Sequence, residues 1–415
     1  MLRGEVHSAF EPVAMELERQ LERSLGGAAI CVYYQGQCVV DLWGGVRDDI
    51  GRPWQRDTMA VCYSTSKGVI STALHVLADR GQIDYDAPVA AYWPEFAQAG
   101  KAAITVRDVM SHRAGLFNIR DLVDHARRML DWDFMVTALA AAPAVRIPDG
   151  ATAYQALTYG FLIGELIRRV SGRSLPQFLS EEIAAPLGLD GLYIGAPDDQ
   201  LHRAARLLDI LARNPEARAA RETVAVRRRR LFRAAERLLR AAGHPADFDR
   251  ATSALAPRGI SSIDFSSAEV MRASIPAANG LFTARSLARL YAALAAGGEL
   301  DGVRLLSPRT VARATEIQHR GFDQVTLFKM RWRLGYHRVG SFRGEPRHAF
   351  GHFGLGGSGA WADPTRNLAM GFIVNTGVGT PMGDMRILRL NTALLGCVHR
   401  MWSLRRRLDA IRTRA

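Results

Sequence analysis

Two residues at the start of an apolar run have the types and spacing of a nucleophile and its base. Ser64 and Lys67 stand three positions apart, ahead of a mostly apolar stretch over residues 69–77 that ends at Gly81. This pattern predicts a buried helix that begins near Ser64 and carries both side chains on one face. The N–H groups and the positive dipole of its first turn would lie beside the serine oxygen. A nucleophilic serine needs such a base and such donors.

The use of lysine at position 67 supports a special role. Of the 54 basic residues only Lys67, Lys101 and Lys329 are lysines, so the remaining 51 are arginines. A chain that otherwise uses arginine for positive charge has reason to use lysine where a buried group must lose its proton. The plain alternative is that Ser64 caps the helix and Lys67 is a solvated residue of the first turn. We favour the catalytic pair.

The totals limit the classes of protein that need to be considered. A chain of 415 residues can form one large domain or two. The four cysteines lack metal-ligand spacing, which favours reduced thiols and gives no reason to expect a metal or a cofactor. The N-terminus lacks the apolar core of a signal peptide, and no apolar run is long enough to span a bilayer. We therefore expect a cytoplasmic protein.

Strand signals lie near both ends of the chain, and helical signals lie between them. The N-terminal part predicts a helix over residues 10–25 and then a hairpin formed by residues 28–34 and 37–43. A helix is expected over residues 307–319. The C-terminal part predicts an antiparallel meander and a last helix, over residues 331–339, 348–353, 359–362, 368–375 and 383–412.

This order predicts an α+β fold, with one antiparallel sheet built from both chain ends, flanked by helices and interrupted by an inserted helical domain. The expected sheet domain comprises residues 1–80 and 259–415, and the helical domain residues 81–258.

An arginine- and alanine-rich insertion is expected over residues 200–258 of the helical domain, as two amphipathic helices. A nucleic-acid or anionic-lipid patch would use these arginines, but no aromatic or glycine pattern accompanies them, which favours a solvated helix face. We expect no nucleic-acid partner, despite a formal net charge of +13. The basic end of the last helix leaves peripheral contact with a membrane open, although cations are ordinary at a helix C-terminus. Nothing in the sequence indicates an oligomeric state.

Two further stretches hold candidate site residues. Tyr154 follows a turn at residues 148–150 and precedes a helix predicted over residues 157–170. His352 lies on a predicted strand, ahead of a glycine-rich stretch. His112 has no partner in the local sequence and is expected to be structural.

With these elements in place, the chain resembles the serine β-lactamase and penicillin-binding superfamily. Within it, the chain is similar to the esterase-like branch, the family VIII carboxylesterases and β-lactamase-related serine hydrolases. The resemblance runs from the first helix to the last, and it implies a β-lactamase/transpeptidase-like fold. It rests on Asp41-Leu-Trp-Gly-Gly45, Ser64-Thr-Ser-Lys67, Tyr92-Trp-Pro-Glu-Phe96, Ser111-His-Arg-Ala-Gly-Leu116 and Phe350-Gly-His-Phe-Gly354.

The resemblance implies a role for each candidate. Ser64 would be the acylated nucleophile and Lys67 its activating partner. Tyr154 matches the tyrosine of the Tyr-x-Asn motif, which shares the base role and serves the leaving group. The stretch from His352 to Gly354 matches the strand motif that lines the site. The oxyanion hole would be the backbone N–H groups of Ser64 and Leu355.

Three departures from the family pattern concern the substrate. Ala156 stands where asparagine is usual, His352 where β-lactamases have lysine, and Phe353 where they have threonine. These residues favour small uncharged esters over β-lactams and peptides. Two alternatives stay open, an amide or β-lactam hydrolase on the same machinery and a non-catalytic relative that binds a ligand or an anion. The absence of a Gly-x-Ser-x-Gly motif disfavours an α/β-hydrolase.

Overall fold

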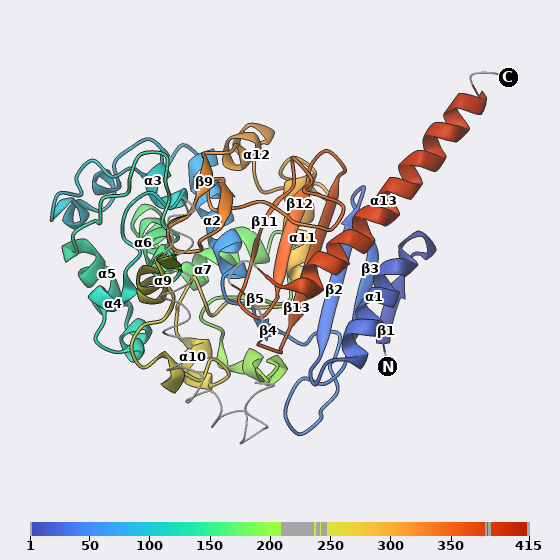
Figure 1. The fold of residues 1–415 in the computed structure, drawn as a ribbon, viewed down its shortest axis with the longest axis horizontal. Coiled ribbons are helices and arrows are strands. Elements are labelled where there is room, and N and C mark those ends of the chain that lie inside the picture. The colour runs from blue at the N-terminus through green and yellow to red at the C-terminus, as the bar shows by residue number, and fades with distance from the viewer. Residues whose placement is uncertain are drawn as a thin grey trace.

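The computed structural model describes residues 2–208, 236–237, 241, 247–377, 380 and 383–412. At its centre is a six-stranded antiparallel sheet with the strand order β1-β3-β2-β13-β12-β11 (Figure 1). Its strands are β1 Leu2–Val6, β2 Ala28–Tyr34, β3 Gln37–Gly44, β11 Phe350–Phe353, β12 Gly359–Asp363 and β13 Leu368–Val374. Because β2 pairs directly with β13, the predicted α+β fold with a sheet built from both chain ends is confirmed.

Local sequence explains the two hairpins of this sheet. Gln35 and Gly36 both have positive φ, 51° and 77°, as a two-residue hairpin turn with right-handed strand twist requires. The β12–β13 turn begins at Asp363, whose carboxylate accepts a hydrogen bond from the N–H of Thr365 at 3.0 Å. All seven residues of β13 are buried, because helices cover both faces of the sheet.

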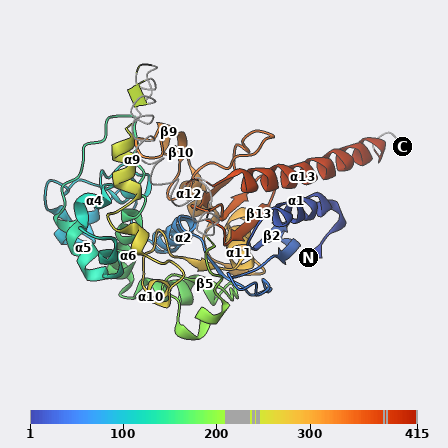
Figure 2. The ribbon, with the colours of Figure 1, turned by 60° about the horizontal axis from the view of Figure 1, so that its bottom comes forward.

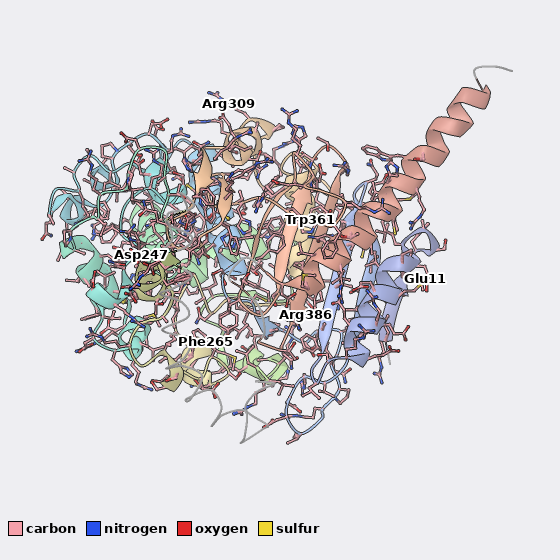
Figure 3. All side chains as sticks on the ribbon, viewed as in Figure 1. Glu11, Asp247, Phe265, Arg309, Trp361 and Arg386 are labelled. Atoms are coloured by element: carbon pink, nitrogen blue, oxygen red, sulfur yellow. The ribbon has the colours of Figure 1, made fainter. Side chains whose placement is uncertain are left out.

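One face of the sheet is covered by α11 (Ala284–Ala295), which packs on β2, β12 and β13. The approach is close, since a Cβ on Gly371 of β13 would lie 2.4 Å from the carbonyl oxygen of Ala284. The other face is covered by α1 (Glu11–Glu22) and α13 (Met385–Arg412), which lie side by side (Figures 1 and 2). Trp361 of β12 donates its indole N–H to Asn391 of α13 at 2.8 Å (Figure 3).

The helical part of the molecule lies beside the sheet and is centred on α2 (Thr65–Asp79). The first thirteen residues of α2 are buried, as expected for a helix that is apolar on nearly every side. It packs against α6 (Thr158–Ser171) and against β11 at the edge of the sheet. This position brings its N-terminus to the junction between the sheet and the helices.

The remaining elements are short. The helices are α3 Val106–Met110, α4 Ile119–Leu122, α5 Trp132–Ala141, α7 Leu175–Leu179, α9 Phe248–Leu255, α10 Ala268–Arg272 and α12 Pro308–Thr315. The strands are β4 Ala60–Val61, β5 Leu192–Tyr193, β6 Leu281–Phe282, β7 Glu299–Leu300, β8 Val303–Arg304, β9 His319–Phe322 and β10 Lys329–Trp332. β6 pairs with both β4 and β5 and so ties the segment before α2 to the segment before α11.

The structure differs from the sequence-based expectations in three places. The N-terminal strand β1 was not predicted. The segment 331–339 is not a strand of the main meander, because β10 pairs with β9 in a separate sheet, and a single bridge from His337 to Gly351 reaches the edge strand β11. The helix expected over residues 307–319 ends at Thr315, before β9 begins. Most of the two helices expected over residues 200–258 lies outside the described residues, which there include η6 (Asp198–Arg203) and α9.

Among the described residues, no helix is long and apolar enough to cross a membrane. Nor do these residues bring together three histidine, cysteine or acidic side chains in a group that could hold a metal ion.

Candidate active site

Ser64 stands at the N-terminal end of α2, where the backbone turns sharply out of β4. The preceding residue, Tyr63, has φ of 45°, a left-handed conformation that is uncommon for a residue with a side chain. The Ser64 side chain makes no capping hydrogen bond to the helix and is 9% exposed. The interpretation of Ser64 as a plain N-cap is therefore wrong, and its hydroxyl is free for other partners.

Those partners include Lys67, which lies one turn further along the helix. Its Nζ lies 2.9 Å from Ser64 Oγ and donates to the carbonyl oxygens of Ala156 at 2.6 Å and Ala277 at 3.2 Å. The side chain is fully buried, so the interpretation of Lys67 as a solvated residue is wrong. Burial lowers the pKa of Lys67 well below its usual value.

The three neighbours of the Lys67 amine fix its orientation. The two carbonyl oxygens can only accept hydrogen bonds, and a neutral amine has two N–H groups and one lone pair. When both N–H groups point to Ala156 and Ala277, the lone pair is left for the hydroxyl of Ser64. The arrangement therefore suits a neutral lysine that accepts the serine proton.

Tyr154 reaches the same serine from the other side of the site. Its hydroxyl donates to Ser64 Oγ at 2.9 Å, and its ring is fully buried. Burial is the largest cause of a strongly raised pKa for this phenol, and the nearby Asp323 carboxylate raises it further. Tyr154 is thus a protonated hydrogen-bond donor at neutral pH, with the Lys67 amine 4.9 Å from the centre of its ring.

A buried carboxylate that sequence analysis did not identify holds Tyr154 in place. Asp323 accepts hydrogen bonds from the N–H of Tyr154 at 3.2 Å, the hydroxyl of Thr152 at 2.8 Å and the indole N–H of Trp332 at 3.3 Å. Backbone N–H groups of the following turn donate to it as well. The Trp332 ring stacks on Tyr154 at 5.5 Å and 7°. Asp323 and Trp332 therefore fix both the backbone and the ring of Tyr154.

His112 belongs to the same cluster but in the structural role that was predicted for it. Its ring packs edge-on against Tyr154 at 4.9 Å and Trp332 at 4.3 Å, and its Nδ1 accepts the N–H of Gln155 at 3.3 Å. Burial is the largest cause of a pKa well below the usual value, so the ring stays neutral. Its Nδ1 is thereby available as an acceptor, and His112 supports the loop that carries Tyr154.

Asp323→Asn should destabilise the protein more than Trp332→Phe does. The asparagine places an amide N–H₂ among N–H and O–H donors, which leaves buried donors unpaired at roughly 1–3 kcal/mol each. The phenylalanine keeps an aromatic ring against Tyr154 and removes one donor only. Urea unfolding of both variants measures the order of the two losses in free energy. Equal losses would contradict the predicted order, and a larger loss in Trp332→Phe would show that Trp332 dominates the support of Tyr154.

His352 lies on β11, with its side chain buried on the side that faces Tyr154. Its Nδ1 is 3.0 Å from the carbonyl oxygen of Phe353, and its Nε2 has no hydrogen-bond partner among the described residues. Burial, followed by the charges of His337 and Lys67, lowers its pKa well below the usual value. His352 is therefore a neutral imidazole beside the site. Phe353, the next residue on the strand, packs in the core under α1 and α13 and does not line the site.

The end of β11 passes close to the start of α2. A Cβ on Gly354 would lie 2.2 Å from the carbonyl oxygen of Cys62 and 3.2 Å from the backbone nitrogen of Ser64, so only glycine fits there. Leu355 follows, with a side chain that is 42% exposed. Within the described part of the chain, the backbone N–H groups of Ser64 and Leu355 donate no backbone hydrogen bond. Both are free to bind an oxygen atom.

The segment 277–280 completes the site and was not among the candidate site residues. The carbonyl oxygen of Ala277 binds Lys67, and the N–H of Gly280 donates to Ser66 Oγ at 3.0 Å. The Asn279 side chain donates to the carbonyl of Val270 at 2.7 Å and accepts the N–H of Ile275 at 3.0 Å, which fixes the turn. A backbone carbonyl carries no signal in the sequence, so neither Ala277 nor Ala156 could have been identified as a partner of Lys67.

Comparison with known proteins agrees with this geometry. The family model described as Beta-lactamase matches residues 13–394. The esterase/beta-lactamase LipL of Mycobacterium tuberculosis is 40% identical over 361 residues, which cover 85% of this chain and 78% of LipL. Among solved structures, a penicillin-binding protein homologue from Caulobacter crescentus is 35% identical with a TM-score of 0.80, and it is matched over 96% of this chain and 100% of its own.

A family VIII carboxylesterase of known structure is 34% identical with a TM-score of 0.82, and the match again covers 96% of this chain and 100% of the other. These matches span nearly the whole fold described above and include the segments that carry Ser64, Lys67 and Tyr154. The chain belongs to the beta-lactamase family and is a serine hydrolase of the esterase-like kind.

Proposed function

We propose that this protein hydrolyses small, uncharged carboxylic esters through an acyl-enzyme on Ser64. The observation that carries the proposal is that a buried lysine and a buried tyrosine each lie 2.9 Å from one serine oxygen. A weakly nucleophilic hydroxyl next to a neutral amine is an activated nucleophile. The relatives named as esterases support the same class of substrate.

In the acylation step, Ser64 Oγ attacks the ester carbonyl carbon while Lys67 takes its proton. The negative charge that develops on the carbonyl oxygen is stabilised by the N–H groups of Ser64 and Leu355. Collapse of this intermediate breaks the bond to the alcohol, and Tyr154 donates a proton to the departing alkoxide. The proton that Lys67 accepted restores the phenol, so the protonation states of the pair are recovered.

In the deacylation step, a water molecule takes the place of the alcohol. The Lys67 and Tyr154 pair removes a proton from this water as it attacks the acyl carbon, and the same oxyanion site stabilises the second intermediate. Return of the proton to Ser64 Oγ releases the carboxylic acid. The proton transfers in both steps use Lys67 and Tyr154, which each lie 2.9 Å from the serine oxygen.

The preference for uncharged esters follows from two of the three positions at which the chain departs from the family pattern, Ala156 and His352. Ala156 offers a methyl group where a side-chain amide would bind a substrate amide, and its carbonyl oxygen is already engaged by Lys67. His352 is neutral and provides no fixed charge for a substrate carboxylate. The amide and carboxylate groups of a bound β-lactam would therefore be left without hydrogen-bond partners. Each unpaired neutral group weakens binding by roughly 1–3 kcal/mol, and a charged group by more. Phe353 does not enter this argument, because its side chain lies in the core.

The test compares kcat/KM for short p-nitrophenyl esters and for a chromogenic cephalosporin. We expect the esters to be preferred by at least about thirtyfold, since two unpaired groups cost at least about 2 kcal/mol. A cephalosporin that is turned over equally well would favour the alternative, a β-lactam or amide hydrolase on the same residues. Labelling with a fluorophosphonate distinguishes both from a non-catalytic binding protein, which would remain unlabelled.

A further inference from the structure

A tight turn before β11 presents an aromatic and a cationic residue to solvent. The N–H of Gly344 donates to the carbonyl of Ser341 at 3.2 Å, and the Ser341 hydroxyl donates to the carbonyl of Gly344 at 2.6 Å. The two central residues are Phe342, which is 60% exposed, and Arg343. The N–H of Phe342 donates to Thr392 Oγ1 at 2.9 Å, which attaches the turn to α13. The phenyl ring and the guanidinium are thus held outside the core.

This turn, α1 and α13 line a groove of about 260 Å³. Its charged lining residues are Glu16, Arg19, Arg343, Arg389 and Arg400. Glu16 is already engaged, since it pairs with Arg19 and accepts a hydrogen bond from Gln20. Within the described part of the chain, the other three arginines form no ion pair with a carboxylate. The groove therefore has three uncompensated positive charges.

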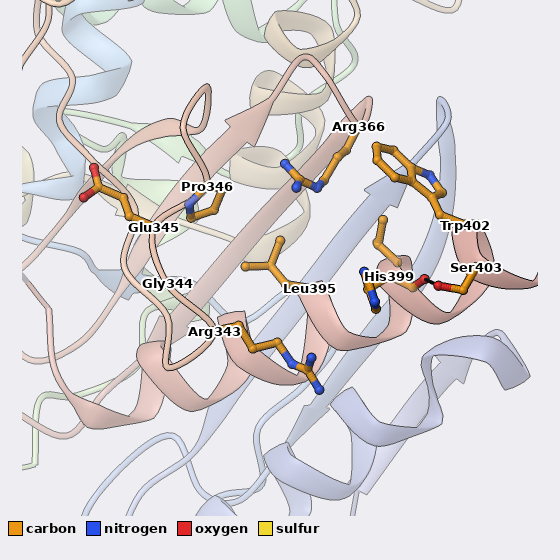
Figure 4. A pocket seen from close by; sticks show the side chains of 10 residues that line it. Arg343, Gly344, Glu345, Pro346, Arg366, Leu395, His399, Trp402 and Ser403 are labelled. Atoms are coloured by element: carbon orange, nitrogen blue, oxygen red, sulfur yellow. Dashed lines mark hydrogen bonds between the residues drawn. The ribbon is translucent and has the colours of Figure 1, made fainter. Parts of the chain in front are cut away.

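A second groove of about 480 Å³ lies on the other side of Arg343 (Figure 4). Arg366, His399 and Trp402 line it, and the Arg366 guanidinium lies 5.5 Å from the Trp402 ring. Arg343 reaches across α13 between the two grooves at Gly396, where a Cβ would lie 3.3 Å from its Nε. We call Phe342, Arg343, Arg389 and Arg400 the arginine collar. All four residues line the first groove, and Arg389 and Arg400 lie on one face of α13.

Apolar side chains accompany these cations. Met15 of α1 is 64% exposed and shares a helix face with Pro12 and Arg19, which line the first groove, and with the exposed Glu11 and Glu18. Exposed apolar groups next to unpaired arginines match the two layers of a membrane surface, the anionic headgroups and the acyl boundary beneath them. A nucleic acid would satisfy the charges but would leave Met15 and Phe342 in water, unless a base stacked on the ring.

We propose that the arginine collar docks the protein on membranes that contain anionic phospholipids. The lipid phosphates pair with Arg343, Arg389 and Arg400, and Phe342 and Met15 enter the headgroup layer. The contact is peripheral and reversible, because its attraction depends on charges that salt screens. It does not depend on the reaction at Ser64.

Co-sedimentation with phospholipid vesicles tests this docking in the full-length protein. The parent should bind vesicles of phosphatidylcholine mixed with phosphatidylglycerol, should ignore pure phosphatidylcholine, and should be released by high salt. The triple variant Arg343→Gln/Arg389→Gln/Arg400→Gln should bind about a hundredfold more weakly, since each arginine near an anionic surface contributes roughly fivefold. Phe342→Ser should weaken binding even at low salt, because it removes the apolar contact.

A matched control separates the collar from the net charge of the whole protein. Arg146→Gln/Arg258→Gln/Arg309→Gln removes the same charge from exposed arginines elsewhere, one of which is labelled in Figure 3. We expect this variant to bind within a few-fold of the parent, and both triple variants to keep the parent's circular dichroism and ester turnover. Equal losses in the two triple variants would overturn the proposal. So would collar-dependent binding of duplex DNA by a parent that binds no vesicles.

Discussion

Replacing Ser64 with alanine should lower kcat/KM for a p-nitrophenyl ester by about 10⁴–10⁶-fold, the usual loss when a serine nucleophile is removed. The fold should remain intact. The Ser64 side chain makes no capping bond to α2, so alanine does not remove a cap from the helix. Among the side chains of the described residues, its hydroxyl forms hydrogen bonds only with Lys67 and Tyr154. The expected change in unfolding free energy is below about 1 kcal/mol.

Ser71→Ala provides the control for this experiment. Ser71 lies on the same helix, and its hydroxyl donates to the carbonyl of Lys67 at 2.6 Å and contacts the Tyr159 hydroxyl at 2.7 Å. It does not contact the hydroxyl of Ser64, so its loss should change stability more than turnover. Mass spectrometry of the parent treated with a fluorophosphonate should locate the adduct on the peptide that contains Ser64. An adduct on another serine, or a Ser64→Ala enzyme that still turns over the ester, contradicts the assignment.

The parts of the fold that could be predicted are those specified by short-range pattern. The β2–β3 hairpin has alternating and β-branched residues around Gln35 and Gly36, which accept positive φ. The N-terminus of α2 follows from the change to helical periodicity after Ser64. Strand β1 could not be predicted in this way, because three of its five residues are exposed and it pairs only with β3 among the described strands.

The other errors arose because the sequence does not indicate which distant strands pair with one another. The residues of β10 have strand character, but nothing local indicates that they pair with β9 and not with β11. The orientation of Phe353 has the same origin. Once His352 faces Tyr154, alternation along β11 turns the phenyl ring to the opposite face. The direction of the whole strand is set by pairing with β12, which no short pattern contains.

In the candidate site as well, the residues that are close in sequence were predictable, and those from distant segments were not. Ser64 and Lys67 are three residues apart on one helix, so their proximity was predictable from the sequence. Tyr154 was identified through the resemblance to a family, and the structure brings it to the same oxygen atom. Asp323 and Trp332 were missed because they reach Tyr154 from a segment about 170 residues away, with no motif that marks them. Non-local support of this kind is visible only in three dimensions.

Lys67→Met should abolish turnover and at the same time stabilise the protein near neutral pH. Activity should fall by about 10²–10⁴-fold, because the group that accepts the proton of Ser64 is lost. Stability should rise because methionine fills a similar volume and has no charge to give up on burial. The carbonyls of Ala156 and Ala277 lose a donor, which offsets part of this gain.

The lowered pKa of Lys67 determines how the free energy of unfolding of the parent protein changes with pH. Burial lowers the pKa of Lys67 in the folded state, whereas the unfolded chain keeps a value near 10.4. Between these two pKa values the unfolded state holds one proton more than the folded state, so the stability of the parent rises with pH by about 1.4 kcal/mol per pH unit. Below the folded-state value and above the unfolded-state value, this contribution is constant. The methionine variant lacks it altogether.

The difference in unfolding free energy by which Lys67→Met exceeds the parent should therefore become smaller as pH increases. Urea unfolding of parent and variant at about pH 7 and about pH 9 should show it falling by up to roughly 2.7 kcal/mol, two pH units of this slope. Lys67→Arg is the companion variant. A guanidinium keeps its proton, so this variant should be inactive like the methionine variant but less stable than the parent at both pH values. Unfolding free energies of parent and Lys67→Met that run parallel from pH 7 to pH 9 would mean that Lys67 is protonated in the folded protein. It could not then serve as the base for Ser64.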